Sequence, residues 1–220
     1  MNKGVIFDFD GVIIDSFRVQ EKALLDSYRI IVGEGEPSVT EFLSYSGDSL
    51  ENIFCHMNLP LTMVEPYKRI SRENIDCIVV FDGIVEILNR LKEQGYKTGL
   101  CTGKNRERTI EILNYFNLSM YFDVVICSDD VGRAKPAPDS LALAIQLLSL
   151  DKKNAVMIGD APNDIKCAKN IAMKSIAVTW GKIDRQLLEK EQPDCIVNDI
   201  CEFEKVLKQT LQETEEKSIC

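Results

Sequence analysis

Two pairs of aspartates have the spacing of acidic groups that act together. Asp8 and Asp10 lie two residues apart in the segment DFDG, and Asp160 and Asp164 lie four apart in GDAPND. Four carboxylates in one cleft would repel one another unless a cation lay among them, and an all-oxygen ligand set selects Mg²⁺ over zinc or copper. Each pair also has a plainer explanation, because aspartates are common in turns, at helix N-caps and in the first turn of a helix.

Two more segments offer what a phosphoryl group requires. The hydroxyl of Thr102 and the small residue Gly103 let hydrogen-bond donors approach a phosphate oxygen. Lys135 comes just before a helix that we expect to begin near Ala137. Taken alone, the Thr102 segment is explained as a strand-to-helix turn, and Lys135 is explained as a solvated surface lysine. Arg133 is a nearby basic residue that could take the place of Lys135. Combined with the aspartates, they predict phosphoryl transfer, in which catalysis is mostly positioning and charge neutralisation.

The single histidine narrows the choice of nucleophile. His56 lies in sequence far from the aspartate, threonine and lysine segments, and we expect it at the surface or in packing. A Ser-His-Asp triad would depend on this one residue, and a metal site with two histidines cannot be built from one chain. A carboxylate that forms an aspartyl phosphate is an established alternative, and the sequence favours it.

Composition limits the partners and the compartment. The chain of 220 residues is 45% hydrophobic with a formal net charge of -9, which suits one α/β domain with an insertion or two small domains. No Lys/Arg run stands out, so neither nucleic acid nor a membrane surface is expected as a partner. None of the eight cysteines forms a C-x-x-C pair, and we expect reduced thiols in a cytoplasmic protein. The apolar stretch 5–7 is too short for a signal or membrane-spanning segment.

Short apolar runs alternate with helical patterns over most of the chain. Continuous apolar runs are typical of strands buried on both faces of a parallel sheet, and we expect such strands at 5–7, 98–101, 124–127, 156–158, 175–178 and 195–197. Helical apolar faces lie at 84–91, 141–148 and 203–211. This alternation predicts a doubly wound α/β sheet, whose ligands bind beyond the carboxyl ends of the strands.

Residues 17–79 depart from that alternation. No clear strand pattern is present there, and helical segments are expected around 39–46, 48–57 and 63–76, separated by glycine and proline. The sequence therefore predicts an all-helical insertion after the first strand. The polar tail 212–220 is expected to fray.

The motifs, in their order, resemble those of the haloacid dehalogenase-like (HAD) superfamily over nearly the whole chain: Asp8-Phe9-Asp10-Gly11-Val12, Thr102-Gly103, Lys135-Pro136-Ala137-Pro138, and Gly159-Asp160 with Asp164. The resemblance implies a Rossmann-like catalytic core of residues 1–16 and 80–220 with a helical cap of residues 17–79. It implies a phosphatase acting on phosphoric monoesters. Dehalogenase-type members lack an acid at the position of Asp10, so Asp10 favours phosphatase or phosphomutase chemistry.

The resemblance also implies a role for each matched residue. Asp8 attacks phosphorus, and Asp10 protonates the leaving oxygen and then deprotonates water. Thr102, Gly103 and Lys135 bind the phosphoryl oxygens. Mg²⁺ is held by Asp8, the backbone carbonyl of Asp10 and Asp160, with Asp164 in support.

At a finer level the chain is similar to the phosphoglycolate-phosphatase-like branch, and within it to phosphatases associated with 3-amino-5-hydroxybenzoate synthesis. The similarity lies in residues 32–37, 59–61, 65–66, 102–104 and 180–181. A small phosphorylated metabolite is the expected partner, and the protein is expected to be a monomer or homodimer. Specificity contacts are expected from the following residues: Ser16, Arg18, Tyr45, Ser46, Gly47 and Asp48.

Three alternatives stay open at this point. A sugar phosphomutase of the same fold would return the phosphoryl group to its substrate instead of to water. A phospho-acceptor signalling domain also combines acids, a threonine and a lysine, but the early Asp8 and Asp10 and the helical insertion disfavour it. An inactive binding protein would not need all four motifs.

Overall fold

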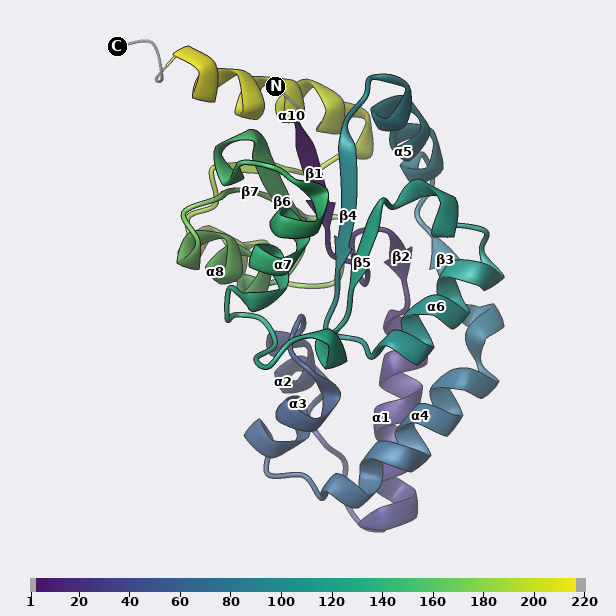
Figure 1. The fold of residues 1–220 in the computed structure, drawn as a ribbon. Helices are drawn as coiled ribbons and strands as arrows, with labels where there is room; N and C mark the ends of the chain where they lie inside the picture. The colour runs from purple at the N-terminus through teal and green to yellow at the C-terminus, as the bar shows by residue number, and fades with distance from the viewer. Residues whose placement is uncertain (1–2, 217–220) are drawn as a thin grey trace.

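A computed structural model describes residues 3–216, which form a six-stranded parallel sheet with helices on both faces and a group of helices at one end (Figure 1). The strands lie in the order β5-β4-β1-β6-β7-β8. Their bounds are β1 Gly4–Phe7, β4 Lys97–Cys101, β5 Val124–Ile126, β6 Ala155–Gly159, β7 Lys174–Val178 and β8 Cys195–Val197. The predicted doubly wound sheet is confirmed, and each predicted strand is found to within one residue at either end.

Alternate residues of the strands face two hydrophobic layers. On one face Val5 and Phe7 pack with α5 (Ile84–Glu93), α6 (Arg106–Tyr115) and α10 (Ile200–Glu216). On the other face Ile6 packs with α7 (Asp139–Leu148) and α8 (Pro162–Asn170), and α9 (Arg185–Lys190) adds Leu188. Because both faces are covered, the strands carry apolar side chains in succession, which is why they are recognisable in the sequence.

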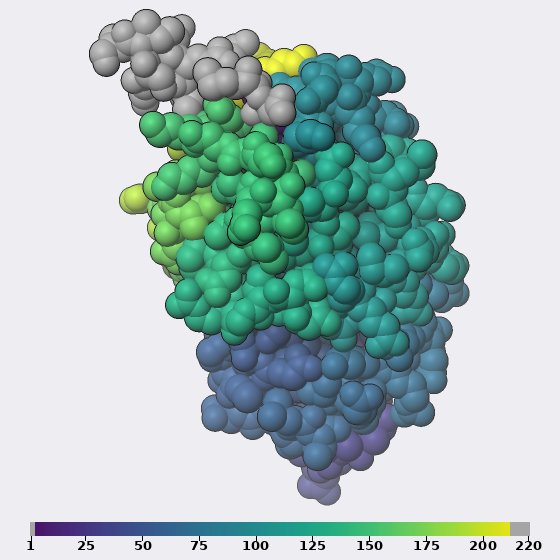
Figure 2. All heavy atoms as spheres, in the orientation of Figure 1, coloured from purple at the N-terminus to yellow at the C-terminus, as the bar shows by residue number. Residues whose placement is uncertain are grey.

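The helices of residues 17–77, called the insertion below, have a hydrophobic cluster of their own. Leu24, Phe42, Phe54 and Met63 are buried together, in a cluster separate from those of the sheet. The elements are α1 Phe17–Ile31, α2 Val39–Ser44, α3 Leu50–His56, η1 Leu61–Met63, α4 Val64–Glu73 and η2 Ile75–Cys77. Figure 2 shows this part of the chain, in purple and blue, gathered at one end of the molecule.

A small antiparallel ribbon lies where the chain enters and leaves these helices. It pairs β2 (Ile14–Asp15) with β3 (Val79–Val80). The sequence analysis missed it, because two residues are too few to show the alternation that identifies a strand. The remaining short elements are the 3₁₀ turns η3 Ser119–Tyr121, η4 Ser128–Asp130 and η5 Lys152–Asn154.

Two predicted boundaries are displaced. Helix α7 begins at Asp139 and not near Ala137, because Ala137 precedes Pro138 and a residue before proline disfavours the helical conformation. Helix α10 continues to Glu216, so residues 212–216 of the tail expected to fray are helical, and 217–220 lie outside the described residues.

The seven cysteines among the described residues have free thiols, and Cys220 lies outside them. Within residues 3–216, no helix combines the length and apolar character needed to cross a membrane.

Candidate active site

The carboxyl ends of the three central strands bring the predicted segments together. Asp8 follows β1, Thr102 follows β4 and Asp160 follows β6, and β1 lies between the other two. The sheet ladder extends to Asp8, whose N–H donates to the carbonyl oxygen of Ile158 at 2.8 Å. These side chains therefore begin where the pairing of the strands ends, at the edge where doubly wound sheets bind ligands.

Lys135 lies at the centre of a buried ion-pair cluster. Its Nζ donates to Asp8 Oδ1 at 2.8 Å, to Asp164 Oδ1 at 2.6 Å and to the carbonyl oxygen of Cys101 at 3.0 Å. Only 2% of Lys135 is exposed. An ammonium group has three donors, and here each has an acceptor. A buried charge is stable only when it is paired and hydrogen-bonded in this way.

Burial and mutual repulsion control the protonation of these groups. Burial raises the pKa of Asp8 to about 7, although Lys135 acts in the opposite direction. Burial, followed by repulsion from Asp8 and Asp164, raises the pKa of Asp160 well above its usual range. Burial disfavours the ammonium of Lys135, but the charges of Asp164 and Asp8 outweigh it and raise the pKa of the lysine. Lys135 alone therefore does not keep these carboxyl groups ionised, and with no cation bound Asp8 is partly protonated near neutral pH.

A divalent cation fits this cluster. Asp8, Asp160 and Asp164 each offer one carboxylate oxygen, and these oxygens lie within 4.8 Å of one another. Three ionised carboxylates beside one ammonium would leave two negative charges, which a divalent cation would offset. Hard oxygen ligands around this charge suit Mg²⁺, and Asp164, predicted only in support, belongs to the cluster itself.

Two glycines make room beside Asp160. A Cβ atom added to Gly11 would lie 1.9 Å from Asp160 Oδ2, and one added to Gly181 would lie 2.3 Å from the same oxygen. Both distances are shorter than any non-bonded contact, so any larger residue at either position would displace the carboxylate. The position of the Asp160 carboxylate therefore depends on glycine at both positions.

Asp10 is held by groups outside that cluster. Its Oδ1 accepts hydrogen bonds from the Ser16 hydroxyl and from Gln20 Nε2, the latter at 3.1 Å, and its Oδ2 lies 2.7 Å from Lys104 Nζ. Ser16 and Gln20 belong to the start of α1, whereas Lys104 follows β4. The Asp10 carboxylate therefore joins the sheet to the first helix of the insertion.

The loop after α2 lies directly on the core. Asn163 Nδ2 donates to the carbonyl oxygens of Tyr45 and Ser46 at 3.2 and 3.0 Å. A Cβ atom on Gly103 would lie 2.3 Å from the carbonyl oxygen of Asp48. Residues 45–48 are thus held over this edge of the sheet by the side-chain amide of Asn163, and they can lie there because Gly103 has no side chain.

Thr102 is buried at the end of β4 beside that loop. Its Oγ1 accepts the N–H of Lys104 at 3.2 Å, and its own N–H donates to the carbonyl oxygen of Ile126 at 3.0 Å. The hydroxyl hydrogen is left for another acceptor, because accepting a bond does not use it. Thr102 can therefore still donate to a phosphoryl oxygen.

A cavity of about 100 Å³ lies between the core and the insertion. Of the predicted site residues, Asp8, Asp10 and Gly103 line it. Asp160 borders a smaller cavity, and Lys135 borders another, which Asp48 also lines. Thr102 and Asp164 line none of these three cavities, each of which lies where the core meets the insertion.

Only three of the six residues expected to set specificity line the cavity. Ser46, Gly47 and Asp48 line the cavity, whereas Tyr45 stacks on His56 with ring centroids 5.0 Å apart. Ser16 contacts Asp10, as described above. Arg18 is exposed on α1.

Four residues near the site were missed by the sequence analysis: Gln20, Lys104, Arg108 and Asn163. Lys104 and Asn163 lie within motifs that had been recognised, so adjacency was an available signal for them. Arg108 lines the cavity and donates from Nη2 to the carbonyl oxygen of Ser71 at 2.6 Å. Its Nε is the only buried side-chain nitrogen or oxygen among the described residues without a hydrogen-bond partner. No sequence pattern pointed to Gln20 or Arg108, because each reaches the site only through the packing of the helix that carries it.

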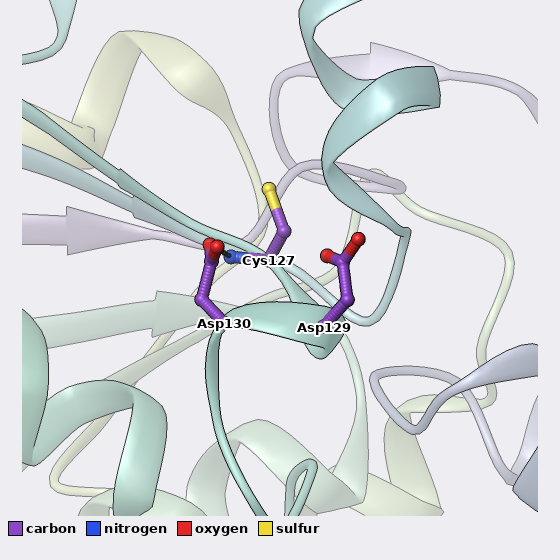
Figure 3. Close-up of side chains that lie close together, drawn as sticks. All are labelled: Cys127, Asp129 and Asp130. Atoms are coloured by element: carbon purple, nitrogen blue, oxygen red, sulfur yellow. Dashed lines mark hydrogen bonds between the residues drawn. The ribbon is translucent and has the colours of Figure 1, made fainter.

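A second acidic group does not have the features of a metal site. Cys127, Asp129 and Asp130 lie together at the η4 turn (Figure 3). Asp130 accepts the Cys127 N–H at 2.7 Å and pairs with Arg106, whose own N–H donates to Asp129 at 2.8 Å. Burial raises the pKa of the Cys127 thiol to about 11. Arg106 neutralises Asp130, Asp129 accepts the backbone N–H of Arg106, and the thiol is protonated, so the group stabilises the turn.

Comparison with known sequences gives a consistent result. The model of the haloacid dehalogenase-like hydrolase family matches residues 5–178. The PpaX protein of Caldanaerobacter subterraneus subsp. tengcongensis is 32% identical over 216 residues, which cover 93% of this chain and 94% of that protein. The pyrophosphatase PpaX of Bacillus mycoides is 30% identical and covers 92% of this chain and 95% of its own length. The similarity to 3-amino-5-hydroxybenzoate phosphatases stays a prediction.

Solved structures share the fold. A predicted phosphatase from Clostridium acetobutylicum matches with a TM-score of 0.80 and 26% identity, over 94% of this chain and 100% of that one. A hydrolase from Pseudomonas syringae matches with a TM-score of 0.85 and 19% identity, over 94% of this chain and 99% of that one. At that lower identity, the second match shows the fold alone.

Proposed function

The chain belongs to the haloacid dehalogenase-like hydrolase family and is a phosphatase, and from this premise we propose that it hydrolyses a small phosphomonoester through an aspartyl phosphate on Asp8, with Mg²⁺ as cofactor. The proposal is supported above all by the buried contact of Lys135 with Asp8 and Asp164. In this proposal residues 1–16 and 80–220 form the catalytic core. Residues 17–79 act as a cap that excludes water while the phosphoryl group is transferred.

In the first step the Asp8 carboxylate attacks phosphorus. The bond between phosphorus and the leaving oxygen breaks, and Asp10 gives its proton to that oxygen, so that an alcohol leaves and the phosphoryl group stays on Asp8. The ammonium of Lys135 offsets the negative charge that gathers around Asp8. The hydroxyl of Thr102 and the N–H of Gly103 hold the phosphoryl oxygens in place.

In the second step water attacks the phosphorus of the aspartyl phosphate. Asp10, now a carboxylate, takes the proton from this water, and the bond between phosphorus and Asp8 breaks to release phosphate. General acid–base help of this kind typically contributes about 10²–10⁴-fold. Bound Mg²⁺, held by Asp8, Asp160 and the backbone carbonyl of Asp10 with Asp164 beside them, supplies the charge neutralisation that lets an anionic carboxylate approach an anionic phosphate.

The test is phosphate release from a panel of phosphomonoesters, with Mg²⁺ and with chelator. We expect release that requires Mg²⁺ and is lost in Asp8→Asn. Mass spectrometry of the rapidly quenched enzyme should find phosphate on the peptide that contains Asp8. Asp76→Asn is the matched control, because Asp76 is an exposed aspartate of the insertion. Undiminished release by Asp8→Asn, or no release from any ester by the folded wild type, would contradict the proposal.

Hydrolysis of inorganic pyrophosphate is the second candidate. The curated relative from Bacillus mycoides carries that activity in its name. The same Asp8 chemistry would apply, with phosphate instead of an alcohol as the leaving group. Pyrophosphate therefore belongs in the panel, and product analysis also separates both hydrolyses from a phosphomutase, which releases no free phosphate.

A further inference from the structure

Four basic side chains line the cavity of about 100 Å³, although the chain as a whole has a formal net charge of -9. Two belong to α4 of the insertion, one follows β4, and one belongs to α6. They are Lys68, Arg72, Lys104 and Arg108. Because an acidic protein repels anions at long range, positive charge brought to one small cavity from both parts of the chain favours an anionic ligand there.

Each of these bases has an acidic partner when no ligand is bound. Lys104 pairs with the catalytic Asp10. In the other three pairs the acid is the more exposed member, and the base lies closer to the cavity. These pairs are Lys68–Glu51, Arg72–Glu107 and Arg108–Glu111. Ion pairs with an exposed member contribute little and are screened by salt, so an anion bound inside the cavity can take the place of such an acid.

Arg108 is the base with the most to gain from an anionic ligand. Its side chain is 9% exposed, the lowest fraction of the four. Nη1 donates to Glu111 at 2.7 Å and Nη2 to the carbonyl oxygen of Ser71 at 2.6 Å, whereas Nε has no hydrogen-bond partner. A buried donor without a partner is costly. A guanidinium also presents its donors in a plane that matches the two oxygens of a carboxylate or phosphate.

The reaction places the leaving group on the same side of the cavity as Arg108. The attacking and leaving oxygens lie roughly in line, so a group displaced by Asp8 extends away from the end of β1 and toward Asp10, which protonates it. Burial raises the pKa of Tyr67, the charge of Asp10 raises it further, and the charge of Arg108 lowers it. Asp10 and Arg108 therefore both lie near Tyr67, which lines the same cavity.

We propose that the leaving group of the substrate carries a negative charge of its own, on a carboxylate or a phosphate, and that Arg108 binds this charge and sets the preference for such substrates. The anion replaces Glu111 and is held by Nε together with a terminal nitrogen of Arg108. This inference rests on the proposed phosphatase function and deepens it, because the substrate must carry two anionic groups. The small cavity allows only a short spacer between them.

The test compares phosphoglycolate with the phosphate ester of glycolamide, in which an uncharged amide of similar size replaces the carboxylate. The amide withdraws more electron density than the carboxylate and makes its alcohol the better leaving group, so intrinsic reactivity does not favour the acid. We expect kcat/KM of the wild type to be about 10- to 100-fold higher for the acid, the factor that a hydrogen bond to a charged group supplies.

In Arg108→Gln this ratio should fall to about threefold or less, because only the more exposed bases remain. A purely structural role of Arg108 would lower kcat/KM for both esters by the same factor and leave the ratio unchanged. Arg108→Lys keeps the charge without the planar set of donors, so it should give an intermediate ratio, and it serves if the glutamine variant does not fold. Pyrophosphate is measured in the same variants. A fall in Arg108→Gln that Arg108→Lys partly restores would show that Arg108 binds a phosphate as well as a carboxylate.

Arg90→Gln is the matched control. Arg90 is an arginine of the core that pairs with Glu204 and is absent from the described residues that line the cavity, so its variant should keep the wild-type ratio. If the ratio is near one, or is the same in the wild type and both Arg108 variants, and pyrophosphate hydrolysis is equally unaffected, the inference is overturned while the proposed function stands. No release from any ester or from pyrophosphate would overturn both.

Discussion

The raised pKa of Asp8 has a measurable effect on stability when no metal is bound. The side chain has a usual pKa of 3.8, and burial raises it to about 7 in the folded protein. The folded state therefore holds a proton that the unfolded chain has already lost near neutral pH. This contribution to stability is fully present below pH 3.8 and is lost as the pH rises through about 7.

The magnitude follows from the two pKa values. Between pH 6 and pH 8 the unfolded carboxyl is ionised throughout, whereas the folded one changes from mostly protonated to mostly ionised. Linkage then makes the metal-free protein about 1.4 kcal/mol more stable at pH 6 than at pH 8 on account of Asp8 alone. The raised pKa of Asp160 acts in the same direction. Lys135, whose pKa is raised above its usual value, is charged at both pH values and cancels from the difference.

Urea unfolding in chelator at the two pH values measures this difference. The Asp8→Asn variant has no carboxyl to titrate at this position and should lose about 1.4 kcal/mol of the pH dependence. Adding Mg²⁺ to the wild type should remove the advantage of pH 6, because a cation stabilises the ionised carboxylates. If the free energy of unfolding had the same pH dependence in the wild type and Asp8→Asn, this would refute the inference that burial raises the pKa of Asp8 by more than Lys135 lowers it.

Three further substitutions test the contacts around the site. Lys135→Met should cost about 3–5 kcal/mol in urea unfolding, because it leaves buried carboxylates unpaired, and should abolish phosphate release. Gly103→Ala should lower kcat/KM and increase amide hydrogen exchange of residues 45–48, because no space exists for the new methyl group. Gly132→Ala is its control, since nothing lies within 4 Å of that position, and it should change neither. Asn163→Ala should increase the same amide exchange by removing two hydrogen bonds worth about 1 kcal/mol each, and exchange equal to wild type would contradict this role.

The central sheet was predictable because each strand carries its own evidence. A strand covered by helices on both faces needs apolar residues in succession, as in Val5-Ile6-Phe7, and this pattern is local. The position of Asp8, Thr102 and Asp160 at one edge follows from the same pattern, because parallel strands end together. The helical insertion was also foreseeable, since residues 17–79 lack strand patterns and contain glycine and proline between amphipathic segments.

The contacts between distant segments were not predictable in the same way. Lys135 is separated from Asp8 by 127 residues, and a lysine before a proline is, locally, a surface lysine. Asn163 was seen only as part of an acidic motif, yet its amide holds residues 45 and 46 of the insertion. Arg108 and Leu50 face the cavity because α6 and the insertion pack against each other, and neither residue type signals this.

By itself, the sequence determined the types of chemical group and the strand ends on which they stand, because both depend on residues that are neighbours in the chain. Only the tertiary structure decided which charged groups are paired, which carboxylates lie close enough to one another to share a cation, and what lines the space above Asp8. Those properties depend on burial and on distances between groups far apart in the sequence. The packing of the core sets the distances among Asp8, Lys135 and Asp164, and the insertion adds to their burial, because Gly47 lies against Lys135 and Asp164.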